Sequence, residues 1–340
     1  MRILGPLVVG CLLLLALAPS ALGAVHLPPR GKVFWGGQGG YTAGHIADFE
    51  RQSGKHPAVF NYFISWRATS SDLHWLALRL SDATRMRART LLSISTADTG
   101  LTPAEIARGE GDGFLIALTR LLAQEGQITY LRFLSEMNNG DNPYSAYDLS
   151  GRPRGPAFST TQFKRAWRRL ALIVRGGDVA AVDAGLGRLG LPPVRTEAST
   201  LPQPQVALLW VPLSFGNPEI ARNHPRHFWP GPAYVDWVGT TWYSPYKRSA
   251  AMHALYRGRP WRRKPFVFAE WGVWGRDDPG FVRQFFSFLR SHPRVRMAVY
   301  YQSALLKPEF RLATHPATRG TLRRAVRWPR LLGVAPEFIR

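Results

Sequence analysis

The chain has 340 residues, of which 45% are hydrophobic, and a formal net charge of +22. This length allows one large hydrophobic core or two modest ones. The single cysteine, Cys11, lies in an N-terminal apolar run that we expect to be removed. The sequence therefore excludes disulfide frameworks, zinc–thiolate sites and thiol catalysis in the mature protein.

The N-terminal segment has the pattern of a secretory signal peptide. A basic residue precedes an apolar run that extends through Leu17, and small residues follow it up to Gly23. The run is too short for a comfortable membrane span. Cys11 lies in a weak lipoprotein-like motif, but the strongest apolar residues come after it, which favours cleavage near Gly23. We expect residues 1–23 to be a signal peptide, residues 24–340 to form the mature domain, and the protein to be secreted.

The positive charge comes mainly from arginine, which is spread along the chain with a few local clusters. Such a field attracts polyanions, including nucleic acid, anionic lipid headgroups and acidic cell-wall polymers. The alternative is solvated surface charge from an arginine-favouring genome. No nucleic-acid recognition motif accompanies the charge, and export argues against that role, so nucleic acid is not an expected partner.

Eight apolar segments rich in Val, Ile, Phe, Tyr and Trp are predicted to be strands. They are nearly continuous in apolar character, as is typical of strands that are buried on both faces. The predicted strands are 33–35, 58–64, 90–94, 128–134, 206–212, 235–241, 266–269 and 295–301.

Helical patterns lie between these strands. Leucines recur at helical spacing over 115–122, and aromatic and aliphatic residues do so over 163–174 and 281–289. Ser159 or Thr160 is predicted to cap the second of these helices and Asp278 the third, because these residues stand just before each pattern begins.

The alternation of strand and helix predicts a single-domain α/β protein with a (β/α)8 TIM-barrel fold. An open doubly wound sheet is the competitor, and it would carry a dinucleotide-binding loop after the first strand. The glycine-rich residues 36–40 stand at that place, but the third glycine position of the motif is Thr42. The glycine- and proline-bearing connection 176–205 is predicted to extend one rim of the cleft.

Two glutamates stand at the ends of predicted strands, where a barrel carries its chemistry. Glu136 follows the fourth predicted strand and Glu270 follows the seventh. A carboxylate at the end of a buried strand is costly unless it has partners or a task. Two of them, brought together by the fold, are what a glycosidase needs. For either residue alone, the alternative is an ordinary glutamate paired with a neighbouring cation.

Aromatic residues also gather at the predicted strand ends, among them Trp66, Trp242, Tyr243 and Trp271. Flat aromatic rings suit the apolar faces of pyranose sugars, so these residues are candidates for binding substrate. For any single tryptophan the alternative is a place in the barrel core. No cluster of histidine or cysteine suggests a metal site, and no metal or other cofactor is expected.

Four stretches resemble glycoside hydrolase family 26, a group of retaining (β/α)8-barrel enzymes that includes endo-β-mannanases and some β-glucanases and xylanases. Residues 132–138 are similar to the family's segment with an arginine followed by Glu-Met-Asn. Residues 234–243 and 264–272 look like its sixth and seventh strands, and 300–302 look like its eighth.

The resemblance implies roles for individual residues. Glu136 would be the general acid/base and Glu270 the nucleophile. Tyr243 would hydrogen-bond the nucleophile, and Arg132 would lie beneath the acid/base. Asn138 and Trp271 would line the sugar cleft.

The chain departs from the family at two places near the expected substrate site, where the family has histidines. Ser135 stands where the family has a histidine that contacts substrate, immediately before the acid/base. Ser95 and Thr96 stand at the end of the third strand, where the family often has another histidine.

The sequence therefore predicts an exported retaining endo-β-glycosidase, mannanase-like, that acts on β-mannan or a related polysaccharide. Two other hypotheses remain open. One is a catalytically inactive sugar-binding barrel, and the other is a basic protein that binds an anionic cell-wall polymer.

Overall fold

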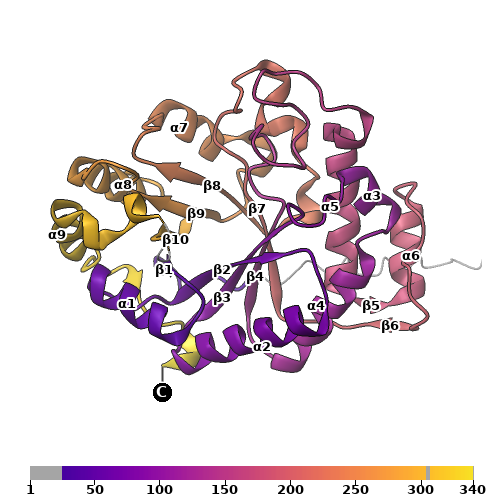
Figure 1. The fold of residues 1–340 in the computed structure, drawn as a ribbon, viewed down its shortest axis with the longest axis horizontal. Helices are drawn as coiled ribbons and strands as arrows, with labels where there is room; N and C mark the ends of the chain where they lie inside the picture. Colours follow the sequence, from indigo (N-terminus) through magenta and orange to yellow (C-terminus); the bar gives the residue numbers. More distant parts are fainter. Residues whose placement is uncertain (1–24, 304–306, 340) are drawn as a thin grey trace, which may run out of the picture.

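The computed structural model describes residues 25–303 and 307–339, so the predicted signal peptide lies outside the described residues. Within them, eight parallel strands close into one barrel, because β1 pairs with β2 on one side and with β10 on the other (Figure 1). The predicted (β/α)8 barrel is confirmed, and the open doubly wound sheet is wrong.

Each of the eight predicted strands coincides with a barrel strand, with small differences at the ends. The barrel strands are β1 Val33–Gln38, β2 Val59–Ser65, β3 Arg89–Ser95, β4 Thr129–Phe133, β7 Val206–Trp210, β8 Trp237–Tyr243, β9 Phe266–Gly272 and β10 Val295–Tyr301. Three two-residue strands lie outside the barrel wall: β5 Gly177–Asp178, β6 Thr200–Leu201 and β11 Leu331–Leu332.

The helices surround the barrel (Figure 1). They are α1 Ala43–Ser53, α2 Ser70–Arg85, α3 Pro103–Arg108, α4 Asp112–Glu125, α5 Thr160–Arg175, α6 Val179–Gly187, α7 Ser249–Arg257, α8 Pro279–Ser291 and α9 Pro316–Ala325. Short 3-10 helices occur at Pro156–Phe158, Ala221–Asn223, Pro225–Phe228, Pro232–Tyr234, Arg259–Trp261, Pro308–Phe310, Leu312–Thr314 and Pro336–Phe338.

The structure confirms Asp278 as a cap and selects Ser159 for α5, since Thr160 is already the first residue of that helix. The Ser159 hydroxyl accepts a hydrogen bond from the Gln162 backbone N–H at 3.3 Å at the start of α5. The Asp278 carboxylate accepts one from the Phe281 N–H at 2.9 Å at the start of α8. Each cap satisfies a backbone donor that the first helical turn leaves free.

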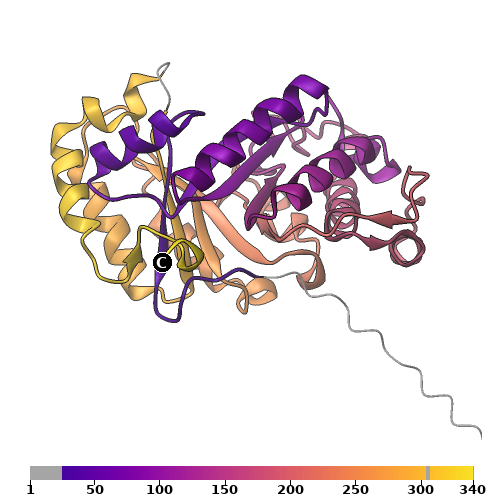
Figure 2. The same ribbon diagram turned by 90° about the horizontal axis from the view of Figure 1, so that it is seen from below.

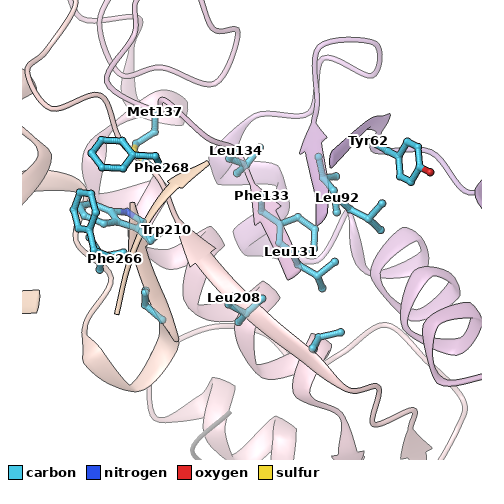
Figure 3. Close-up of a cluster of buried hydrophobic side chains, with 14 of the residues drawn as sticks. Tyr62, Leu92, Leu131, Phe133, Leu134, Met137, Leu208, Trp210, Phe266 and Phe268 are labelled. Carbon is cyan, nitrogen blue, oxygen red and sulfur yellow. The ribbon is translucent and has the colours of Figure 1, made fainter. Parts of the chain in front are cut away.

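The strands present alternate side chains to two separate cores. An outer core lies between the strands and the helices, and Figure 3 shows part of it with Leu131, Phe133 and Trp210. An inner core fills the barrel and includes Tyr130 and Trp237. Because strand side chains alternate, a run that is apolar at every position fills both cores, which is why these strands read as continuous apolar segments.

The barrel interior changes from apolar to polar toward the carboxyl ends of its strands. Along the inner face of β3, Leu91 belongs to the inner core. Ser93 is buried and donates to the Asn61 side chain at 2.9 Å, and Ser95 lines a cavity at the strand ends. The sequence alternation therefore builds both an apolar plug and a polar site within one barrel.

The chain segments near both ends of the described residues close the base of the barrel (Figure 2). Arg89 is buried there and donates to the Glu337 carboxylate at 2.6 Å and to the His26 carbonyl at 2.9 Å. The Tyr130 hydroxyl also donates to the His26 carbonyl, at 2.7 Å. The base is thus tied together by polar contacts and is separate from the carboxyl-end site.

The connection between α5 and β7 does not extend a rim of the cleft, so that prediction is wrong. It forms β5, α6 and β6, and Figure 1 shows these elements outside α5. The physical reason is topological, because a connection from a helix to the next strand starts at the opposite end of the barrel from the site. None of the described residues 176–205 lines the cavities at the strand ends.

A buried ion pair anchors this connection to the barrel helices. Arg169 of α5 is 0% exposed and Asp112 of α4 is 1% exposed, and they are joined by a hydrogen bond of 2.8 Å. Arg169 also donates to the carbonyls of Pro192 and Pro193 at 2.7 and 2.8 Å.

Within the described residues, no helix has the length and apolar character of a membrane span.

We predict that Asp112→Ala lowers the free energy of unfolding by about 3–5 kcal/mol, because it leaves the Arg169 guanidinium buried without its counter-charge. The control is Arg152→Ala, which removes the exposed partner of Asp148 and is expected to have a much smaller effect, because exposed ion pairs contribute little to stability. Urea denaturation of both variants measures the difference. Equal effects would contradict the role of the buried pair.

Candidate active site

The fold brings Glu136 and Glu270 to the same buried guanidinium. Arg132 is 1% exposed and donates from Nη1 to Oε1 of Glu270. Its Nη2 lies 3.8 Å from Oε1 of Glu136. Two carboxylates that are far apart in the sequence therefore share one cation at the carboxyl ends of β4 and β9.

Arg132 reaches this position because it lies on the inner face of β4. Its neighbours Leu131 and Phe133 belong to the outer core, so alternation directs Arg132 into the barrel above the apolar plug. Nη1 also lies 3.3 Å from the Ser93 hydroxyl, which accepts its hydrogen bond. This polar surround compensates part of the cost of burying the charge.

A β-bulge in β9 directs Glu270 into the barrel. Thr240 and Thr241 of β8 are successive residues, but they pair with Phe268 and Glu270, so β9 contains one extra residue there. The pairing with β10 shows the same irregularity. Without the bulge, Glu270 would share the outer face with Phe268, because side chains alternate. The bulge is therefore what makes Glu270 available to the site.

Tyr243 holds the second oxygen of Glu270. Its hydroxyl donates to Glu270 Oε2 at 2.6 Å. Burial, followed by the charge of Glu270, raises the pKa of Tyr243 well above its ordinary value, so the phenol stays protonated and remains a donor. Glu270 thus accepts hydrogen bonds from a guanidinium and a phenol, which fix the orientation of its carboxyl group.

Glu136 lies in a different electrostatic environment. Burial, followed by the nearby charge of Glu270, raises its pKa above the ordinary value for a glutamate. The charge of Arg132 and hydrogen bonds from Thr241 and Asn139 act in the opposite direction but do not cancel the rise. The pair therefore combines a carboxyl group whose pKa is raised, Glu136, with one whose two oxygens are held by donors, Glu270.

Glu136 stands on a strained turn. Leu134 and Glu136 have φ angles of +43° and +52°, a region that residues other than glycine seldom adopt. Such positions cost on the order of 1–3 kcal/mol each and persist where surrounding contacts enforce them. Contacts around residues 134–136 must therefore hold the turn in this conformation.

Two side chains from the following loop hold this turn by its carbonyl groups. The Tyr144 hydroxyl donates to the Ser135 carbonyl at 2.7 Å. Asn142 Nδ2 donates to the carbonyls of Ser135 and Glu136 at 3.2 and 2.9 Å. The Glu136 N–H in turn donates to the Val211 carbonyl at 2.7 Å. Sequence reasoning missed these positioning residues, although the run of asparagines after Glu136 was a visible signal.

Trp66 and Trp271 do not reach the cavity, so the prediction that they bind substrate is wrong. Trp66 is 2% exposed and packs on Phe114 and Phe133. Trp271 is fully buried and stacks on Phe285 of α8, with ring centroids 3.5 Å apart. The bulge explains the second case, because it moves Glu270 to the inner face and leaves Trp271 on the outer face.

Asn138 and Trp242 have structural contacts in place of the expected exposure to the cleft. Asn138 is fully buried, and its side chain accepts from the Leu213 N–H at 2.9 Å and donates to two carbonyls of the same loop. Trp242 borders a cavity next to the site but is only 3% exposed and packs on phenylalanines of α8. Both residues support the walls of the site from behind.

The catalytic cavity, a hollow of about 340 Å³ around Glu136 and Glu270, is lined by four further aromatic residues, of which only Tyr301 lies in a stretch that the sequence singled out by its resemblance to the family. These are Phe63, Trp274, Tyr301 and Phe310. Trp274 is 37% exposed and stacks on Phe310, with ring centroids 5.1 Å apart. Three of the four stand on strand-to-helix loops or at the last residue of a strand, where apolar periodicity carries no signal.

Ser135 and Ser95 also line the catalytic cavity. The two departures from the family's histidines therefore both face the site.

Within the described residues, no group of three or more His, Cys, Asp or Glu is placed to hold a metal ion.

Comparison with known proteins finds likeness in structure alone. No family model matches the chain, and no curated protein sequence is similar to it. The structure of Bacillus subtilis mannanase man26 aligns with a TM-score of 0.59 and 16% identity over 92% of this chain and 90% of that chain.

Two further structures align in the same way. A family 26 β-mannanase from Bacteroides ovatus has a TM-score of 0.58 and 15% identity, over 89% of this chain and 90% of that chain. A modular endo-β-1,4-mannanase from Cellulomonas fimi has a TM-score of 0.59 and 16% identity, over 92% of this chain and 75% of that chain. The chain thus has a fold like that of glycoside hydrolase family 26, as the sequence resemblance implied.

We predict that Tyr144→Phe lowers kcat by about tenfold with little change in KM, because the strained Glu136 turn loses one of its donors. The loss should shrink for a substrate with a good leaving group, which needs less proton donation. The control is Tyr147→Phe, on the same loop, whose ring lies over the Arg222 guanidinium. An equal loss with both substrates would contradict a positioning role for Tyr144.

Proposed function

We propose that the protein is a retaining glycoside hydrolase that cleaves a β-linked polysaccharide. The observation that carries this proposal is the pair of carboxyl groups, Glu136 and Glu270, that share the buried Arg132 guanidinium within one cavity. A fold like that of family 26 glycoside hydrolases supports it. Retaining enzymes place their two carboxyl groups about 5–5.5 Å apart, and a shared guanidinium favours such a short spacing.

In this mechanism Glu270 attacks the anomeric carbon while Glu136 donates its proton to the departing glycosidic oxygen. A glycosyl ester forms on Glu270 as the leaving sugar is released. Glu136, now ionised, takes a proton from water, and that water attacks the anomeric carbon and frees Glu270. Tyr243 and Arg132 orient the nucleophile, and their hydrogen bonds stabilise the negative charge that returns to Glu270 when the ester breaks.

β-Mannan is the first substrate to test, because the structures that align with this chain are named as mannanases. Ser135 and Ser95 offer short hydroxyls where the family has imidazoles. A serine hydroxyl has a shorter reach than an imidazole, so these two positions contact a mannan substrate less closely. We therefore propose that the range of substrates extends to related β-glycans.

We further propose that the protein acts outside the cell, since its N-terminal sequence has the signal-peptide pattern. A polysaccharide too large to enter the cell would be met there. The net charge of +22 would hold the enzyme near an anionic cell-wall polymer.

We expect the wild type to cleave at least one of β-mannan, β-glucan and xylan, with release of new reducing ends. Glu136→Ala and Glu270→Ala should each lower the rate by at least about a hundredfold, because each removes a group that reacts with substrate. Azide should rescue Glu270→Ala and give a glycosyl azide of inverted configuration. Glu219→Ala is the control, because Glu219 is exposed and pairs with Arg248.

Binding of these glycans without cleavage by the folded wild type would contradict the proposed activity. That result would favour the sugar-binding barrel. Full activity in both alanine variants would instead place the chemistry on other residues.

The proposed roles also predict the pH dependence. The raised pKa of Glu136 means that its protonated form persists above the usual range, and activity is lost as pH rises through that pKa. Because the charge of Glu270 contributes to the rise, Glu270→Gln should lower the Glu136 pKa. Carboxyl carbon-13 NMR titration of both proteins measures the change, and an unchanged or higher Glu136 pKa would contradict the coupling.

A further inference from the structure

A second cavity of about 340 Å³ lies beside the catalytic cavity, and the proposed mechanism does not use it. We call it the β2 cavity because residues at the carboxyl end of β2 form its floor. Phe63 lines both cavities, so the two are neighbours separated by one ring. A chain of sugars seated on the catalytic pair and continuing past Phe63 would enter the β2 cavity.

Exposed aromatic rings form two walls of the β2 cavity. Trp75 of α2 is 57% exposed, and Tyr41 of the loop after β1 is 41% exposed. A single exposed aromatic residue is ordinary, but these two rings line the same cavity, and grouped exposed apolar surface marks a contact site. An indole and a phenol beside a cavity are suited to stack on the apolar face of a sugar ring.

Two arginines give the β2 cavity a positive charge. The guanidinium of Arg79 lies 4.6 Å from the centroid of the Tyr41 ring and has no ion pair with any described residue. Arg67 is exposed and lies 3.6 Å from Asp72, the one carboxylate among the residues that line the cavity. The two guanidinium groups exceed this carboxylate by one charge.

The opposite flank of the catalytic cavity differs in charge. The cavity between the ends of β7 and β8 is lined by Glu136 and Asp141 and by no arginine or lysine. Lys307 lines the catalytic cavity itself, and no described residue forms an ion pair with it. Of the β2 cavity and the cavity between β7 and β8, only the β2 cavity is therefore lined by arginine.

We propose that the β2 cavity binds an anionic sugar unit, such as a uronate, in the same glycan that the catalytic cavity cleaves. Arg79 and Arg67 would hold the carboxylate, since a guanidinium offers paired donors that match a carboxylate, and Trp75 would stack on the ring. The inference rests on the proposed glycosidase function and deepens it by naming an acidic β-glycan as substrate class.

The test compares neutral β-mannan or β-glucan oligosaccharides with the same oligosaccharides after oxidation of C6 hydroxyls to carboxylates. Calorimetry on the Glu136→Gln chain measures binding without cleavage. We expect the oxidised form to bind about tenfold more tightly at low salt, with the preference falling as salt is raised. Equal binding of the two forms would overturn the inference.

Substitutions locate the preference. Arg67→Gln combined with Arg79→Gln should reduce it below about twofold, because the paired donors are lost. Arg85→Gln, on the same helix but outside the cavity and 67% exposed, should leave it unchanged. Trp75→Ala should weaken both oligosaccharides alike. A preference that survives the double variant, or that Arg85→Gln removes equally, would overturn the inference.

Oligosaccharides phosphorylated at C6 distinguish the source of the anion. Tighter binding of the phosphorylated than of the oxidised form would assign the charge to phosphate, and the reverse would assign it to carboxylate. Both results support an anionic subsite. Hydrolysis of neutral glycans without any charge preference would overturn this inference alone, and a charge preference without hydrolysis would overturn only the proposed activity.

Discussion

A buried guanidinium between two carboxyl groups is the interaction on which the rest of the site depends. Burying Arg132 is costly, and the contacts with Glu270 and Glu136 offset that cost only if both lie on the barrel axis side of their strands. The apolar plug below and the Ser93 hydroxyl beside it fix the guanidinium in place. The attraction between Arg132 and the two carboxyl groups thus has two effects. It offsets the cost of burying the guanidinium, and it keeps Glu136 and Glu270 together.

The two carboxyl groups acquire different properties because their supports differ. Glu270 is directed inward by a bulge in β9 and held by the Tyr243 hydroxyl. Glu136 stands on a turn with a positive φ, where it is largely shielded from solvent and close to the charge of Glu270, so its pKa is raised. Both supports depart from regular strand geometry. Such departures concentrate at functional sites, because stability alone would not retain them.

The sequence was informative wherever a physical pattern repeats. The eight strands were predictable because strands buried on both faces are apolar at nearly every position. Glu136 and Glu270 were conspicuous because a carboxylate interrupts such a run. Position at a strand end misled at Trp271, since a single extra residue in β9 turns Glu270 to the inner face and leaves Trp271 on the outer face. A bulge leaves no periodic pattern in the amino-acid sequence, so it could not be predicted.

Loops were less predictable than strands. The connection 176–205 was assigned to the cleft from its composition, although its place between a helix and a strand puts it at the other end of the barrel. Trp274 and Phe310 line the cavity from loops, where neither periodicity nor capping identifies a side chain's direction. The anionic subsite depends on Tyr41, Trp75 and two arginines that come together only in the folded chain.

The most direct test of the account is to trap the glycosyl–enzyme with a 2-deoxy-2-fluoro β-glycoside that carries an activated leaving group. The fluorine slows both steps, and the leaving group restores the first, so the ester accumulates. Mass spectrometry of the digested protein should find the sugar on Glu270. A sugar on any other residue would contradict the assignment of the nucleophile, and turnover with inversion and no trapped ester would contradict the retaining mechanism.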